Sequence, residues 1–189
     1  MNKLIIFFSV AIGVVIFIIF GLVIYKFNFA VDDGNIHTIS ETDVKNSTYL
    51  IDGEQITLKS GYNEKEITTN GASKKITQYF GNDVVGDFNN DGIKDIVFLL
   101  TQISGGSGTF YYLAALVSSG DKFIGTNALL IGDRIAPQTT EFRNDLIIVN
   151  YAERRSDDPF STPPAVGVSK YYKIIDNKLN ESSQTGLKL

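Results

Sequence analysis

The stretch that decides the fold of this chain is Asp87-Phe88-Asn89-Asn90-Asp91-Gly92-Ile93-Lys94-Asp95. Oxygen-bearing side chains stand at alternating positions in it, and a glycine falls where the backbone has to bend. An apolar run, residues 96–100, follows directly. This arrangement is typical of a peptide that surrounds a hard cation with oxygen ligands and then enters a β-strand.

The spacing of these side chains predicts a calcium site. With Asp87 as position one, side-chain oxygens recur at positions three, five and nine, and a glycine holds position six. An EF-hand loop needs glycine at position six and takes its position-seven ligand from a backbone carbonyl. Position twelve carries Phe98 instead of a bidentate glutamate, so the loop is not an EF-hand. The candidate Ca²⁺ ligands are Asp87, Asn89, Asp91, the carbonyl of Ile93, and Asp95.

The pattern D-x-N-x-D-G-x-x-D in front of an apolar strand resembles the calcium loops of FG-GAP and VCBS repeats. The resemblance implies calcium binding by the loop oxygens, and because the pattern occurs once it implies no propeller. The alternative is an Asx-turn hairpin, in which aspartate and asparagine side chains bond only their own backbone.

Residues 4–25 predict a single membrane-spanning helix. These 22 residues carry no charged side chain and lie between Lys3 and Lys26. At ~1.5 Å per residue they reach ~33 Å, enough to cross a ~30 Å hydrocarbon core. A cleavable signal peptide has an apolar region of only ~7–15 residues and a small-x-small cleavage site, which residues 28–30 do not provide. We therefore expect a permanent anchor with residues 1–3 in the cytoplasm and the rest of the chain outside.

The charge of the segment after the anchor narrows the choice of partners. From Val31 onward, 15 basic residues (17 minus Lys3 and Lys26) stand against 21 acidic ones, a net charge of −6. This balance argues against nucleic acid and against an anionic membrane surface as partners. The chain has no cysteine, so it has neither disulfides nor a lipid-modified N-terminal cysteine.

Residues 26–47 are polar and predict a juxtamembrane linker, and residues 48–189 predict one β-rich extracytoplasmic domain. Its fold class is mainly β, sandwich- or barrel-like, and antiparallel.

Segments 96–102 and 109–117 are apolar without clean alternation, so we expect central strands covered on both faces. Segment 72–80 fits a short helix or a strand. The other predicted strands are 49–51, 55–58, 66–68, 123–131, 138–142, 146–149 and 168–175.

Three further segments resemble an uncharacterised class of secreted or membrane-anchored bacterial envelope domains. They are Gly105-Gly106-Ser107-Gly108-Thr109-Phe110-Tyr111-Tyr112, Leu130-Ile131-Gly132-Asp133-Arg134 and Ile147-Ile148-Val149-Asn150-Tyr151. The resemblance implies location in the cell envelope and implies no activity.

Composition argues against catalysis. The one histidine, His37, falls in the predicted linker, and there is no thiol, so a serine- or cysteine-type hydrolase lacks its base or its nucleophile. We expect no catalytic residues and a binding or structural role in the envelope, with a protein or glycan partner. The alternative is a carbohydrate-active or other envelope hydrolase that uses acidic residues.

The long loop 152–166 is the predicted partner-binding surface, because long surface loops on a rigid scaffold often carry recognition. Its charged side chains are Arg154, Arg155, Asp157 and Asp158. The alternative is that these charges only keep the loop in water. At ~3.3 Å per residue, the strand 96–102 would separate the metal loop from the glycine-rich connection 104–108 by ~23 Å.

Overall fold

The computed structural model describes residues 15–20, 39–69, 71–120 and 122–183 of the 189-residue chain. The chain divides into two compact units, Met1–Ile36 and His37–Leu189. In the first unit, residues 15–20 are helical. The rest of the predicted anchor 4–25, the terminus 1–3 and residues 26–38 lie outside the described residues. Among the residues that are described, no helix is both long and apolar enough to span a bilayer.

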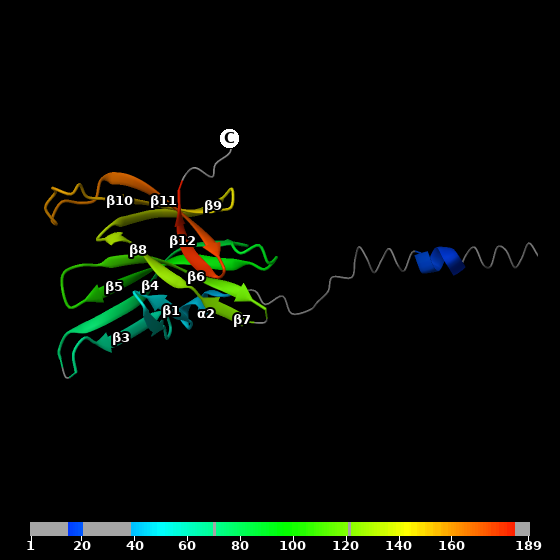
Figure 1. The fold of residues 1–189 in the computed structure, drawn as a ribbon, viewed down its shortest axis with the longest axis horizontal. Helices are drawn as coiled ribbons and strands as arrows, with labels where there is room; N and C mark the ends of the chain where they lie inside the picture. The colour runs from blue at the N-terminus through cyan, green and yellow to red at the C-terminus, as the bar shows by residue number, and fades with distance from the viewer. Residues whose placement is uncertain (1–14, 21–38, 70, 121, 184–189) are drawn as a thin grey trace, which may run out of the picture. The chain divides into compact units, whose positions relative to one another are not determined.

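The second unit is mainly β (Figure 1). Its described elements, in chain order, are α2 (Glu41–Lys45), β1 (Thr48–Ile51), β2 (Glu54–Thr57), β3 (Tyr62–Glu66), β4 (Lys74–Gly86), β5 (Asp95–Ser104), β6 (Phe110–Ser119), β7 (Lys122–Gly125), β8 (Asn127–Asp133), β9 (Ala136–Arg143), β10 (Leu146–Glu153), β11 (Val166–Ile175) and β12 (Lys178–Ser182). These strands form two sheets. The larger runs β2-β1-β8-β6-β5-β4-β3, with β7 also paired to β6, and the smaller runs β12-β11-β10-β9.

The pairing is antiparallel with one exception, which corrects the expectation of an antiparallel fold. Strands β1 and β8 pair in parallel, through Leu50 with Asn127 and Ile51 with Ala128. A parallel pair cannot be joined by a tight turn and needs a long connection. Here the connection runs from Asp52 to Thr126, about half of the domain, before β8 returns to pair with β1.

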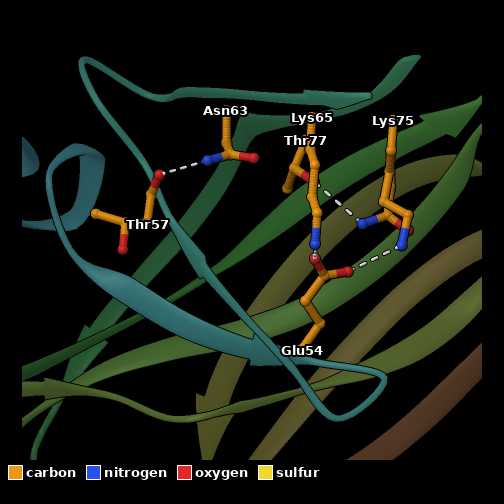
Figure 2. Close-up of polar contacts among 7 residues, drawn as sticks. Glu54, Thr57, Asn63, Lys65, Lys75 and Thr77 are labelled. Atoms are coloured by element: carbon orange, nitrogen blue, oxygen red, sulfur yellow. Dashed lines mark hydrogen bonds and ion pairs between the residues drawn. The ribbon is translucent and has the colours of Figure 1, made fainter. Parts of the chain in front are cut away.

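The larger sheet curls into a nearly closed barrel. Its two outer strands, β2 and β3, meet at a seam where Asn63 Nδ2 donates to the Thr57 carbonyl at 2.8 Å (Figure 2). On the same seam the Glu54 carboxylate accepts from the ammonium groups of Lys65 and Lys75. Hydrogen bonds from Lys65 and then from Lys75 lower the pKa of Glu54 below its ordinary value. These exposed ion pairs contribute little stability, so the barrel depends on the packing inside it.

Two apolar clusters account for that packing. The interior cluster fills the barrel and includes Tyr49, Phe98 and Leu116, with the Tyr49 and Phe98 rings edge to face at 5.3 Å. The inter-sheet cluster lies between the barrel and the smaller sheet and includes Leu99 and Val149. Consecutive residues of β5 enter opposite clusters. Strands β5 and β6 are therefore covered on both faces, as their unbroken apolar sequence predicts.

Part of the predicted linker belongs to the barrel. Ser40 and Asp43 form a capping box that starts α2, and this short helix buries Val44. Val44 and Ile39 join the interior cluster, and the Tyr49 hydroxyl donates to the Val44 carbonyl at 2.7 Å. The polar composition of residues 26–47 hid these two anchoring side chains, because each is a single apolar residue between polar or charged neighbours in the sequence.

Three other segments differ in detail from their predictions. The strand predicted at 66–68 lies earlier in the chain, as β3 at Tyr62–Glu66. The ambiguous segment 72–80 is a strand, the first half of β4. The predicted strand 123–131 is interrupted at Thr126, whose buried hydroxyl accepts from Ala115 N–H at 3.1 Å. The chain thereby passes from β7 to β8 while both remain paired to β6.

Replacing Phe98 with alanine should destabilise the domain by about 3–5 kcal/mol, since it removes a fully buried ring from the barrel interior. The measurement is urea unfolding followed by circular dichroism. Phe160→Ala, at a phenylalanine that is 70% exposed, is the matched control and should cost at most about 1 kcal/mol. Equal losses in the two variants would show that Phe98 is not a core residue.

Candidate functional site

The loop between β4 and β5 is organised by its own aspartates. Asp87 accepts from the backbone N–H groups of Asp91 at 3.1 Å and of Gly92 at 2.9 Å. Asp91 in turn accepts from Ile93 N–H at 2.8 Å. Asn90 and Gly92 have positive φ angles of 60° and 85°, which the turn requires and which asparagine and glycine tolerate best. The loop therefore has the Asx-turn bonding that the sequence offered as an alternative to metal binding.

Asp95 holds the loop in place through buried hydrogen bonds. Its side chain is fully buried, and its two carboxylate oxygens accept from Phe88 N–H at 3.0 Å and from Ser118 N–H at 2.8 Å. Burial raises the pKa of Asp95 to about 6. The negative charges of Asp91 and Asp87 raise it further, whereas the two backbone hydrogen bonds lower it. Asp95 thus ties the start of the loop and the end of β6 to the first residue of β5.

Ser118, near the end of β6, completes the site. Its hydroxyl donates to Asp91, and its carbonyl accepts from Asn89 Nδ2 at 3.1 Å. Burial tends to raise the pKa of Asp91, but hydrogen bonds from Ser118, Ile93 and Asn89 outweigh it and leave that pKa below its ordinary value. Sequence reasoning missed Ser118. Ser118 could be identified only from the register of β5 with β6, because pairing of Ile96 with Leu116 places residue 118 beside the end of the loop.

The loop forms one wall of a cavity of about 520 Å³. Asn89, Asp91 and Ser118 line it on one side, and the β11–β12 turn lines it on the other with Asp176 and Asn177. Both turn residues have positive φ, at 51° and 57°. The cavity is therefore polar on both sides and open to solvent beside the loop oxygens.

The described part of the chain contains no group of three or more histidine, cysteine, aspartate or glutamate side chains positioned to hold a metal ion. The predicted ligand set also includes an amide and a backbone carbonyl, which are not side chains of those four types. All its donors are oxygens, as Ca²⁺ prefers. A carboxylate oxygen that accepts one N–H bond keeps a second lone pair. The residues present therefore fit a calcium ion chemically, and calcium binding by this loop stays a prediction.

The predicted partner-binding residues lie on the loop between β10 and β11, with different roles. Arg154 is used internally: its guanidinium donates to the carbonyls of Thr162 and, at 2.9 Å, of Arg134. Asp158 accepts from Arg155 N–H at 3.2 Å, which closes a turn. The side chains of Arg155 and Asp157 are exposed. Arg154 therefore shapes the loop, and Arg155 and Asp157 remain open to solvent.

This loop faces the turn after β8. The Arg134 guanidinium lies 3.7 Å from the centre of the Phe160 ring, and a cavity of about 440 Å³ lies between the two segments. Strand β8 ends beside the start of β6, where Gly132 pairs with Tyr111. Ser118 and the metal loop lie at the other end of β6, seven residues or ~23 Å away. The structure therefore does not bring the two predicted sites together.

Comparisons with protein-family models, with curated proteins and with solved structures find no match to this chain. The resemblances to FG-GAP-type calcium loops and to bacterial envelope domains therefore rest on the motifs themselves. The assignment of the site rests on the geometry of residues 87–95 and Ser118.

Replacing Asp95 with asparagine should destabilise the domain by about 1.5–3 kcal/mol. The amide can accept with one oxygen only, so the N–H of Phe88 or Ser118 is left facing an NH₂ group in the interior. Urea unfolding at neutral pH measures the loss. Asp145→Asn is the matched control, because Asp145 is exposed in the β9–β10 turn at a φ of 57°, which asparagine also adopts. Similar stabilities for the two variants would contradict the fixing role of Asp95.

Proposed function

We propose that this chain is a membrane-anchored, extracytoplasmic, calcium-binding domain with a non-catalytic binding or structural role in the cell envelope. One observation supports the proposal: Asp87 and Asn89 both accept from Asp91 N–H, and Asp91 and Asp95 both accept from Ser118, so the four side chains are linked where β4, β5 and β6 meet. Residues 4–25 supply the anchor.

The proposed ligands are Asp87, Asn89, Asp91, Asp95 and the Ile93 carbonyl. Bound Ca²⁺ would supply positive charge at a point where the charges of Asp91 and Asp87 add to the raised pKa of Asp95. The residues of the chain do the remaining work. Asp87 and Asp91 orient the loop backbone, and Ser118 joins it to β6.

A structural role suits this arrangement better than catalysis. Asp95 accepts two backbone N–H bonds and is closed to solvent, and Asp91 accepts from the Ser118 hydroxyl. A general base must keep a lone pair within reach of a substrate proton. The carboxylates of this loop instead hold the backbone of three strands together.

Partner recognition is proposed for the loop 152–166. Arg155, Asp157 and Asp158 provide its charges, Arg154 maintains its shape, and Phe160 adds an exposed apolar ring. An aromatic ring and an arginine next to each other are typical of protein interfaces. An envelope protein is therefore the partner proposed for this loop.

Millimolar calcium should raise the melting temperature of the domain relative to chelator. Extracellular calcium modules bind with dissociation constants of ~10⁻⁴–10⁻³ M. A constant of ~0.1 mM would give about 1.4 kcal/mol of stabilisation at ~1 mM calcium. Thermal unfolding of the wild type in chelator, in calcium and in magnesium measures the effect.

Asp91→Ala should abolish the calcium-dependent rise, and Asp157→Ala, at an exposed aspartate of the β10–β11 loop, should keep it. Calcium binding at this loop is refuted if the wild type shows no rise or if Asp91→Ala shows a rise of equal size.

Protease added to intact cells should remove the β-rich domain and leave the N-terminus protected, because residues 4–25 are long enough to remain in the membrane. Antibody tags at the two ends, followed by immunoblotting, report the two fragments. A soluble mature form that begins near Val31 would show that the segment is a cleaved signal peptide.

A further inference from the structure

A groove of about 380 Å³ lies on the outer side of the barrel, at the end of β5 away from the metal loop. Tyr62 of β3, Gln78 of β4 and Thr101 of β5 line it and are direct neighbours across the three strands. Phe80 also lines it, two residues beyond Gln78 on the same face of β4. We call these four residues the aromatic groove.

The two rings of the aromatic groove are open to solvent. Tyr62 is 37% exposed and Phe80 is 46% exposed. The Phe80 ring meets the Tyr111 ring edge to face at 5.3 Å. The Tyr62 hydroxyl donates to Glu64, which fixes the direction of that ring. Two aromatic rings are therefore exposed at this surface, and each is oriented by a contact with another side chain.

Between the rings lie neutral polar groups. Within the described part of the chain, the Gln78 amide, the Thr101 hydroxyl and the neighbouring Ser60 hydroxyl form no side-chain hydrogen bond with the protein. An amide and two hydroxyls can both donate and accept. The one cation of the lining, Lys45, is paired with Glu41. The lining therefore offers free hydrogen-bonding groups and no free charge.

The backbone next to the groove is irregular. Strand β4 shifts register between Tyr79 and Gly81 and again before Val84. Gly81 and Asn82 have positive φ angles of 101° and 62°. Bulges of this kind are frequent beside binding sites, and a strained non-glycine residue persists where the surroundings hold it. The regular ladder of β4 with β5 ends at Tyr79, so Phe80 lies in the bulge itself, at the rim of the groove.

We propose that the aromatic groove binds a short segment of a neutral polysaccharide. A pyranose ring has an apolar C–H face, which matches the faces of Tyr62 and Phe80, and a rim of hydroxyls, which match Gln78, Thr101 and Ser60. An apolar peptide would leave these polar groups without partners, at a cost. A charged ligand would find no free opposite charge in the lining. The volume lies in the lower part of the ~300–1,000 Å³ range of small-ligand sites.

This site goes beyond the proposed calcium and protein-partner functions. Thr101 lies six residues along β5 from Asp95, about 20 Å away. Because no residue of the metal loop lines the groove, sugar binding at the groove does not require calcium at the loop.

The test is co-sedimentation of the full-length chain with insoluble cellulose and with insoluble chitin, both neutral polymers. The protein is kept in a zwitterionic detergent without a sugar headgroup, since glycoside detergents would compete. We expect sedimentation with at least one polymer, release by its soluble oligosaccharides, and the same binding in chelator and in 1 M sodium chloride.

Tyr62→Ala combined with Phe80→Ala should weaken binding about tenfold. Gln78→Ala, at an exposed side chain that contributes no packing, tests the same groove in a variant that keeps the fold. Leu130→Ala, at an apolar side chain of β8 that is 50% exposed and lies outside the proposed sites, is the matched control and should bind as the wild type does.

Three results would overturn the proposal. They are no sedimentation of the wild type with either polymer, wild-type binding by both groove variants, and loss of binding in high salt or in chelator. High-salt loss would indicate an ionic partner, and loss in chelator would place sugar binding at the calcium loop.

Discussion

Burial of β5 and β6 on both faces is the constraint on which the rest of the domain depends. Phe98 and Leu99 are consecutive in β5, and their side chains are buried on opposite faces of the same sheet. Burying a large apolar side chain stabilises the fold by ~1.5–3 kcal/mol, so neither face can be left uncovered. The curl of the larger sheet covers one face and the smaller sheet covers the other, and Figure 1 shows these layers above and below the central strands.

The same burial explains the chemistry at the start of β5. A carboxylate at Asp95 has no water to solvate it, so its oxygens need N–H donors from the loop and from β6. Asp87 and Asp91 bond the N–H groups of the turn in the same way. Asx-turn bonding and ion binding are therefore compatible: the backbone bonds position the oxygens, and an oxygen that accepts one such bond keeps a second lone pair.

Much of this fold could be predicted from local sequence, and the part that could not has a common cause. The apolar runs around Phe98 and Leu113 identify central strands, and the Asp87–Asp95 pattern identifies the loop before one of them. The parallel pairing of β1 with β8, the role of Val44 and the contact of Ser118 with Asp91 join residues distant in sequence. The periodicity of apolar residues along the sequence indicates which face of a sheet a residue occupies. It does not indicate which distant segment covers that face.

The seam of the barrel bears on its candidate recognition surfaces. Strands β2 and β3 are joined there by the hydrogen bond from Asn63 to the Thr57 carbonyl and by the exposed ion pair of Lys65 with Glu54, and Lys75 of β4 also pairs with Glu54. Such contacts are weak and exchange readily with water. Tyr62 lies on β3 beside this seam, whereas Thr101 lies on the doubly buried β5. A ligand that touches both would connect an edge strand of the larger sheet to its doubly buried centre, so occupancy of the aromatic groove would hold β3 more firmly against β4 and β5.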